Sequence, residues 1–215
     1  MNARDLSRLA AMGEGLTLEF KRKVPRAARL AKEVIALANT AGGYVLIGVD
    51  DDGTVVGVRD SFEEQYALAE AVNSHISPAV KLHVERVEIS HRRDALVVRV
   101  PLSERRPHYL VEDANVGRGA AYVRVDSMSI EASSEAIALM RSEGASVSFT
   151  FGEDEQRLMR YLETYGRITV RQFATLCNSD TDTASTALVT LTRAQVLYHH
   201  VGPGEDYFSM ALADE

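Results

Sequence analysis

The chain has 215 residues, of which 46% are hydrophobic, and it carries 24 basic and 31 acidic residues for a net charge of −7. This length and composition support a sizeable core in one large or two small domains, and they exclude fibrous and intrinsically disordered classes. The negative net charge argues against nucleic-acid binding through overall charge, so any such binding requires a local basic patch.

Membrane and redox signals in the sequence point to the cytoplasm. No apolar run approaches the length of a signal-peptide core or a membrane span. The single cysteine, Cys177, excludes an internal disulfide and a cysteine-rich metal site, and it is expected to be a small core residue. We therefore expect a soluble, cytoplasmic protein with no membrane partner.

The first elements place two charged side chains together. Apolar spacing predicts a helix over residues 5–12 and an alternating strand over 16–21. Side chains of a strand alternate between its faces, so Glu19 and Lys21 point the same way. A second helix is predicted over residues 25–40, closed by a pair of glycines.

The next segment, residues 42–58, is predicted to be a glycine-rich antiparallel hairpin. β-Branched runs flank Asp52-Gly53, a dipeptide typical of a two-residue type I′ turn. In that register Gly48 faces Gly57 and leaves a bare patch, with Asp50 beside it, where a helix, another backbone or a phosphate could approach. Alternatively, the acidic residues only form the turn and the glycines fit against a helix.

A helix, a hairpin and short strands follow. A capping box beginning at Ser61 opens a helix that ends before Pro78, and its apolar side is predicted to include Phe62 and Tyr66. The remaining elements of this part are a hairpin around 91–94, strands over 109–111 and 121–125 that flank a loop with Gly117 and Gly119, and a helix over 133–141.

Three compact helices and a third hairpin are predicted after a linker at residues 144–152. This order is typical of a winged helix, a variant of the helix-turn-helix. We therefore predict two domains, residues 1–147 and 148–215. The first contains 19 basic and 21 acidic residues, and the second contains 5 and 10.

Acidic residues and one lysine form the first candidate site. Glu14, Glu19 and Asp50 could hold Mg²⁺ or Mn²⁺ through carboxylate oxygens, and Lys21 could offset the charge that develops on a phosphate during hydrolysis. A solvated strand face with alternating charges is the alternative interpretation.

Basic residues form the second candidate site, a phosphate-contacting surface with a stacking aromatic. Its members are Lys21, Arg22, Lys23, Arg26, Arg29, Arg105, Arg106, His108, Tyr109 and Arg124. A solvated charged face is again the alternative. A continuous positive surface from Arg22 to Arg124 would favour nucleic-acid binding, whereas a broken one would favour an assembly role.

Several motifs in the same order resemble the Schlafen-type AlbA-like domain over about residues 5–142. They are Gly13-Glu14 with Glu19-Phe20-Lys21, the run 38–53 with Gly57 after it, Arg106-Pro107-His108-Tyr109, and Tyr122-Val123-Arg124-Val125. The resemblance implies an α/β (α+β) domain with a mixed or antiparallel sheet that binds nucleic acid. Many prokaryotic members carry a C-terminal winged helix and are described as transcriptional regulators or ATP-binding proteins.

In the Schlafen branch, the resemblance also implies a metal-dependent RNA-cleaving site of three acidic residues. Two match Glu14 and Glu19, and the third matches Asp50 or its neighbour Asp51. Two departures weaken this implication: Asp126-Ser127-Met128 stands where the family usually has Gly-Ser-Ser, and the branch's zinc-binding Cys/His cluster and second AlbA-like unit have no counterpart here.

Three hypotheses follow. The first is a nucleic-acid-binding regulator with no certain cofactor, the second is a ribonuclease that uses Mg²⁺ or Mn²⁺, and the third is a protein-interaction or assembly module. The second domain is expected to self-associate, with a homodimer as the simplest case. Its candidate recognition helix presents one cation, and its hairpin tip carries Glu205 and Asp206, which would repel a duplex.

Overall fold

The computed structural model describes residues 1–111, 119–144 and 146–211. The chain divides into two compact units, Met1–Glu131 and Ala132–Glu215. This boundary lies before the one expected between residues 147 and 148, because helix α4 (Ser134–Arg141) belongs to the second unit. There, Ser185 of helix α7 (Thr181–Arg193) donates a hydrogen bond to the Glu135 carboxylate.

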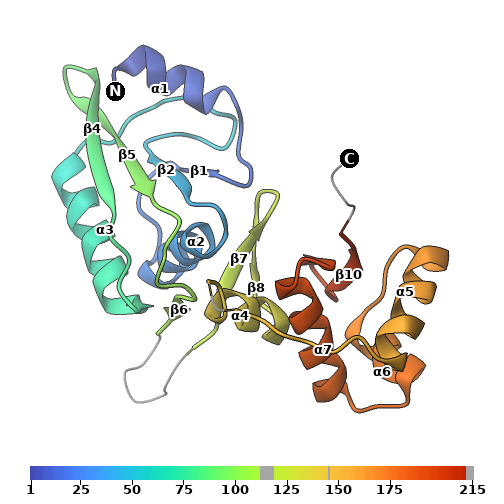
Figure 1. Cartoon of the computed structure of the whole chain (residues 1–215). Helices are drawn as coiled ribbons and strands as arrows, with labels where there is room; N and C mark the ends of the chain where they lie inside the picture. Colours follow the sequence, from blue (N-terminus) through green and yellow to red (C-terminus); the bar gives the residue numbers. More distant parts are fainter. Residues whose placement is uncertain (112–118, 145, 212–215) are drawn as a thin grey trace. The chain divides into compact units, whose positions relative to one another are not determined.

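The first unit is built on a four-stranded mixed sheet in the order β1-β2-β5-β4 (Figure 1). Strands β1 (Leu18–Lys21) and β2 (Gly43–Ile47) are parallel. Strand β5 (Arg93–Val100) pairs antiparallel with both β2 and β4 (His83–Ser90). The mixed sheet and the β4–β5 hairpin agree with the sequence prediction.

Helices cover both faces of this sheet. Val45 and Ile47 of β2 pack in one hydrophobic cluster with α2 (Ala27–Thr40) and α3 (Ser61–His75). Leu46 lies in the cluster on the opposite face, with residues of α1 (Ala3–Ala10). Because both faces of β2 are buried, the sheet presents no bare face at this strand.

The turn after β2 differs from the predicted hairpin. The structure has a single bridge, Val49 to Val55, and Asp50 N–H donates to Thr54 O at 2.9 Å, so the pairing is shifted by one residue. Gly53 lies in the left-handed region at φ +83°, and its N–H donates to Asp50 O. The loop therefore has three residues, and the predicted two-residue turn is wrong.

The two glycines at the base of this turn nevertheless approach each other closely. Gly48 O accepts hydrogen bonds from the N–H groups of Val56 and Gly57. A Cβ on Gly48 would lie 2.9 Å from the Gly57 Cα. The glycines thus allow backbone to meet backbone.

Two small sheets complete the first unit. Strand β3 (Ile76–Ser77) pairs with β6 (Tyr109–Leu110), and β7 (Tyr122–Val125) forms a hairpin with β8 (Met128–Glu131). The hairpin packs against α2. Gly117 of the predicted glycine-rich loop lies outside the described residues.

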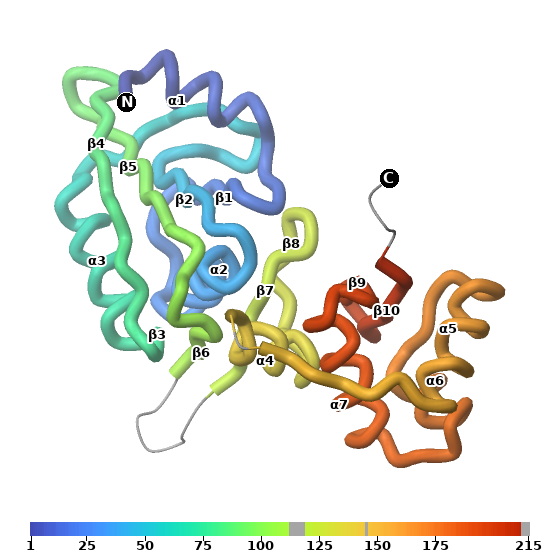
Figure 2. Tube along the Cα trace, viewed as in Figure 1, coloured from blue at the N-terminus to red at the C-terminus, as the bar shows by residue number. Residues whose placement is uncertain are grey.

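The second unit contains three helices and a two-stranded antiparallel hairpin after α4 (Figure 2). Its core is formed by residues that include Leu158, Leu162, Phe173, Leu188 and Phe208. Its further elements are α5 (Glu153–Tyr165), α6 (Val170–Cys177), α7, β9 (Leu197–His200) and β10 (Tyr207–Met210).

Two side observations concern chemistry and membranes. Burial, assisted by the nearby Asp154, raises the pKa of the Cys177 thiol to about 11, so the thiol stays protonated at neutral pH. Within the described ranges, no helix is long and apolar enough to span a bilayer.

Candidate nucleic-acid interface

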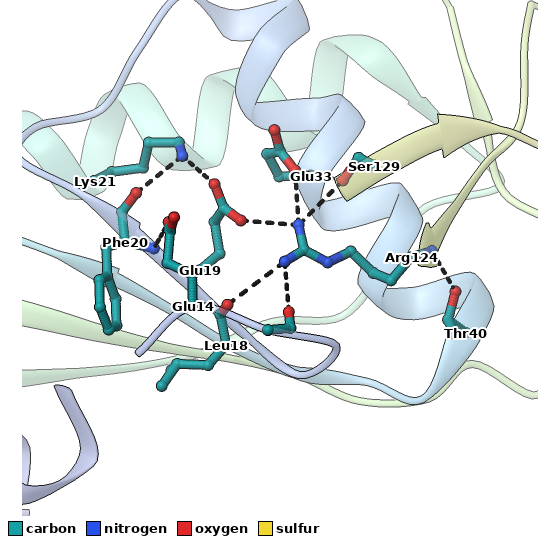
Figure 3. A network of polar contacts seen from close by, with 10 residues as sticks. Glu14, Leu18, Glu19, Phe20, Lys21, Glu33, Thr40, Arg124 and Ser129 are labelled. Atoms are coloured by element: carbon teal, nitrogen blue, oxygen red, sulfur yellow. Dashed lines mark hydrogen bonds and ion pairs between the residues drawn. The ribbon is translucent and has the colours of Figure 1, made fainter. Parts of the chain in front are cut away.

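Arg124 lies at the centre of a buried polar network in the first unit (Figure 3). Its side chain, which is 0% exposed, donates to Glu19 of β1 at 2.8 Å and to Glu33 of α2 at 3.1 Å. The second terminal nitrogen, Nη2, donates to Gly15 O. These bonds tie β7 to β1 and α2, so the prediction that Arg124 contacts phosphate is contradicted by its burial.

The two glutamates of the predicted metal site already have protein partners. The Lys21 ammonium and the Arg124 guanidinium each bind one oxygen of the Glu19 carboxylate. Glu14 accepts the Phe20 N–H at 2.9 Å. Glu19 and Lys21 do share one strand face, as predicted, but they neutralise each other there (Figure 3).

Asp50 has a different partner from these two glutamates. Its carboxylate pairs with the exposed Arg22 at 3.5 Å. In the part of the chain that the structure describes, no group of three His, Cys, Asp or Glu side chains is arranged to hold a metal ion. Since both Glu19 oxygens already bind cations, this donor set does not fit the Mg²⁺ or Mn²⁺ site implied by the resemblance.

His108 and Tyr109 are buried, which contradicts their predicted role on a nucleic-acid surface. His108 N–H donates to the Asn39 side-chain oxygen at 2.8 Å, and the Asn39 amide donates back to His108 O at 3.0 Å. The same amide also donates to Tyr122 O. Asn39 thus fastens the end of α2 to β6 and β7, a role that its place among apolar helix residues could have suggested.

The ring of His108 is held in its neutral form. Burial lowers the pKa of His108 below its usual value, an effect that Arg105 reinforces and that the bond to Pro78 O opposes. Nδ1 lies 2.6 Å from Pro78 O, whereas Nε2 is buried without a partner. A proton on Nε2 would have no acceptor there, which is the physical reason for the shift.

Four of the predicted basic residues are exposed, and they lie close together in the sequence. We call Arg22, Lys23, Arg26 and Arg29 the basic segment; all four are exposed. Arg26 is the N-cap of α2, without a side-chain capping bond, and the first turn contains no acidic residue. Among the described residues, Arg22 has an acidic partner, while the other three have none.

The remaining predicted arginines lie at the opposite end of α2. Ser103 N–H donates to Ala38 O in the last turn of the helix, and the exposed Arg105 and half-buried Arg106 follow shortly after. The 14 residues of α2 span about 20 Å. Because Arg124 is buried, the positive surface from Arg22 to Arg124 is broken.

Sequence reasoning also misplaced two aromatic residues. Phe62 and Tyr66 of α3 are 71% and 72% exposed, although they were expected on its packed side. The buried face of the helix instead carries Leu68, Ala71 and Val72. The Arg86 guanidinium of β4 lies 4.9 Å from the centroid of the Phe62 ring, and this arginine was the sequence signal that was overlooked.

Comparison with known proteins agrees with the motifs of the first unit. Residues 14–133, more than half of the chain, match the family described as Schlafen, AlbA_2. The chain belongs to this family. The Schlafen AlbA_2 match contains Glu14, Glu19 and Arg124 and ends close to the boundary between the two units.

Two solved structures are similar to part of the chain. The N-terminal domain of a RecG-related protein from Nitrosomonas europaea has 30% identity and a TM-score of 0.44, over 60% of this chain and 91% of that one. The DIP2311 protein from Corynebacterium diphtheriae has 18% identity and a TM-score of 0.46, over 67% of this chain and 28% of that one. No curated protein matches the chain.

Proposed function

We propose that this Schlafen AlbA_2 protein binds nucleic acid in the cytoplasm, as a regulator of transcription or of RNA, by contacting phosphates with the basic segment. The observation that carries the proposal is the exposure of four cations within eight positions at the start of α2. The N-terminal end of a helix carries partial positive charge, which adds to the attraction for phosphate.

The charges elsewhere limit the size of this site. The net charge is −7, and Arg124 and His108 are buried, so an extended positive groove is not supported. A compact site that neutralises a few phosphates fits these charges better. The broken surface is the outcome that favours an assembly role, so the binding proposal rests on the basic segment alone.

The test removes charge from the basic segment. We expect the triple variant Lys23→Ala, Arg26→Ala and Arg29→Ala to bind a labelled duplex and a labelled single strand roughly tenfold or more weakly in low salt, because three phosphate contacts are lost. Fluorescence anisotropy measures both affinities. Arg22 is kept because it pairs with Asp50.

A matched control removes the same charge elsewhere. Arg4, Lys81 and Arg160 are exposed, and the triple alanine variant at these positions should retain most of the affinity. Equal losses in the two variants would show that only overall charge matters. Wild-type protein that binds neither oligonucleotide would sink the proposal.

We further propose that the second unit is a winged helix that associates with a second copy of this chain. Thr183 and Thr186 are exposed on α7, whereas Arg193 is half-buried and donates to Ser146 O at 3.3 Å. The outer face of α7 is therefore small and weakly charged, which suits packing against another protein better than against a duplex.

Light scattering on the full chain tests this association. We expect a dimer that Thr186→Glu shifts towards monomer, because the change places a charge in an uncharged interface. Thr164→Glu, at an exposed position of α5, is the control. A wild-type monomer at every concentration would contradict the proposal.

A further inference from the structure

A second cationic site lies at the tip of the β4–β5 hairpin, at a distance along the chain from the basic segment. A depression of about 800 Å³ is lined by residues that include Arg59, Arg86, Arg92 and Arg93, with Glu88 and Asp94. Four guanidinium groups against two carboxylates give this surface a net positive charge. The rest of the chain has the opposite sign overall.

The hydrogen bonds show which of these charges are available. Asp94 accepts from Ser61 at 2.7 Å and pairs with Arg86 at 3.9 Å, so its charge is largely compensated. Arg93 donates to Gly57 O at 2.9 Å, which holds it in place. In the described ranges Arg59 and Arg92 have no acidic partner, and both are exposed.

One exposed aromatic ring adjoins this depression, and a second follows it on the same helix. The Arg86 guanidinium, which lines it, also lies 4.9 Å from the centroid of the Phe62 ring on α3. Tyr66 follows four positions later, on the same side of the helix. The rings, at 71% and 72% exposure, contribute little to the core.

We infer that this aromatic and arginine surface binds single-stranded nucleic acid, with bases stacked on Phe62 and Tyr66 and a phosphate held by Arg59 and Arg92. Single-strand binding needs two components, flat exposed rings and arginines. The bases stack on the rings, and the arginines bind the charged phosphates between the nucleotides. A duplex stacks its bases internally and cannot use the rings.

The neighbouring acidic groups limit the strand to a short path. Glu70 follows Tyr66 by four positions and is exposed, so it would repel a phosphate beyond the second ring. The phosphate is therefore expected on the Arg59 side, and the surface accommodates about two stacked bases. The inference rests on the proposed nucleic-acid binding but assigns it a second site and a strand preference.

The test compares ligands that differ only in their bases. Fluorescence anisotropy is measured with a labelled oligothymidylate, an abasic strand of equal length and charge, and a duplex. We expect wild-type protein to bind oligothymidylate roughly tenfold or more tightly than the abasic strand, and the double variant Phe62→Ala and Tyr66→Ala to lose this difference. Duplex binding should be unchanged in that variant.

Further variants separate stacking, charge and folding. Phe62→Leu keeps apolar volume without a flat ring, so it should weaken oligothymidylate binding as well. Arg59→Ala with Arg92→Ala should weaken both single strands. Tyr198→Ala, at an exposed ring of the second unit, is the control, and thermal unfolding verifies that each variant is folded.

The outcomes distinguish this inference from the proposed function. Equal oligothymidylate binding by the wild type and the Phe62/Tyr66 variant would overturn the inference, while duplex binding that depends on the basic segment would leave the proposed function standing. If the Phe62/Tyr66 variant differs from the wild type in molecular mass, as measured by light scattering, but binds oligothymidylate equally well, the surface is a protein contact. That result would also overturn the inference. No binding of any oligonucleotide would overturn both.

Discussion

Arg124 is a structural residue whose charge is compensated inside the protein. Glu19 and Glu33 both bind its guanidinium, and its side chain is fully buried. Removing one partner of a buried ion pair leaves a charge with incomplete compensation, which costs more than the pair itself contributes. The main role of the acidic residues that resemble a nuclease site is therefore to stabilise the fold.

Glu19→Ala should lower the free energy of unfolding by about 3 kcal/mol, because Arg124 and Lys21 both lose a carboxylate partner. Urea unfolding measures the change. Glu104→Ala, at an exposed position, should change it by less than about 0.5 kcal/mol. Similar losses in the two variants would contradict the structural role of Glu19.

A second variant of Glu19 tests cleavage separately from binding. Glu19→Gln keeps the size of the side chain, and with Mn²⁺ and RNA we expect it and the wild type to be equally inert, because the carboxylate oxygens are occupied by cations. Cleavage by the wild type that Glu19→Gln abolishes, in a folded variant, would restore the ribonuclease hypothesis.

His108 should make the stability of the first unit depend on pH. Burial lowers its pKa in the folded state, so the unfolded chain binds the proton first as the pH falls. Its contribution is fully present above about pH 6.5 and is lost below that value, by at most about 1.4 kcal/mol per pH unit, until the folded-state pKa is reached. Urea midpoints between pH 5 and 8 measure this loss.

A histidine variant isolates this effect from other titrating groups. His108→Gln should flatten the dependence below pH 6.5, whereas His83→Gln, at an exposed position of β4, should leave it unchanged. A slope that persists in His108→Gln would assign the pH dependence to another residue.

At the scale of elements, the join between α2 and β2 requires glycine at position 43. Gly43 has φ +144°, and a Cβ there would lie 2.1 Å from Thr17 O, beside the parallel strand β1. Gly43→Ala should therefore destabilise the first unit by more than about 2 kcal/mol, since backbone must move. Gly15→Ala, with no atom within 4 Å of the added Cβ, should be nearly neutral. Thermal unfolding of the two variants compares them directly.

Elements with a strong local signal were predicted well, and the packing of their faces was predicted less well. The alternation of Leu18, Glu19 and Phe20 placed the glutamate correctly opposite the apolar pair, because strand periodicity is a backbone property. The rotation of α3 was missed, because the spacing of Phe62 and Tyr66 is compatible with a packed face until the true buried face, with Leu68, is known.

At the scale of the whole molecule, the family and the mixed sheet of the first unit were predictable, whereas the site was only partly so. The residues of the basic segment lie close together in sequence, and their exposure follows from their place at the start of α2. The burial of Arg124 depends on β7 meeting β1 and α2, and these contacts join positions about a hundred residues apart. No local pattern reports such contacts, so charge alone suggested a surface residue.

The measurement that tests the central claim most directly is the salt dependence of nucleic-acid binding by the full chain. If the basic segment contacts phosphates, the logarithm of the affinity for a duplex should fall linearly with the logarithm of salt concentration. Replacing Lys23, Arg26 and Arg29 by alanine should reduce that slope by about 2 to 3, one contact for each residue. Binding that does not respond to salt, or an unchanged slope in the variant, would contradict the account.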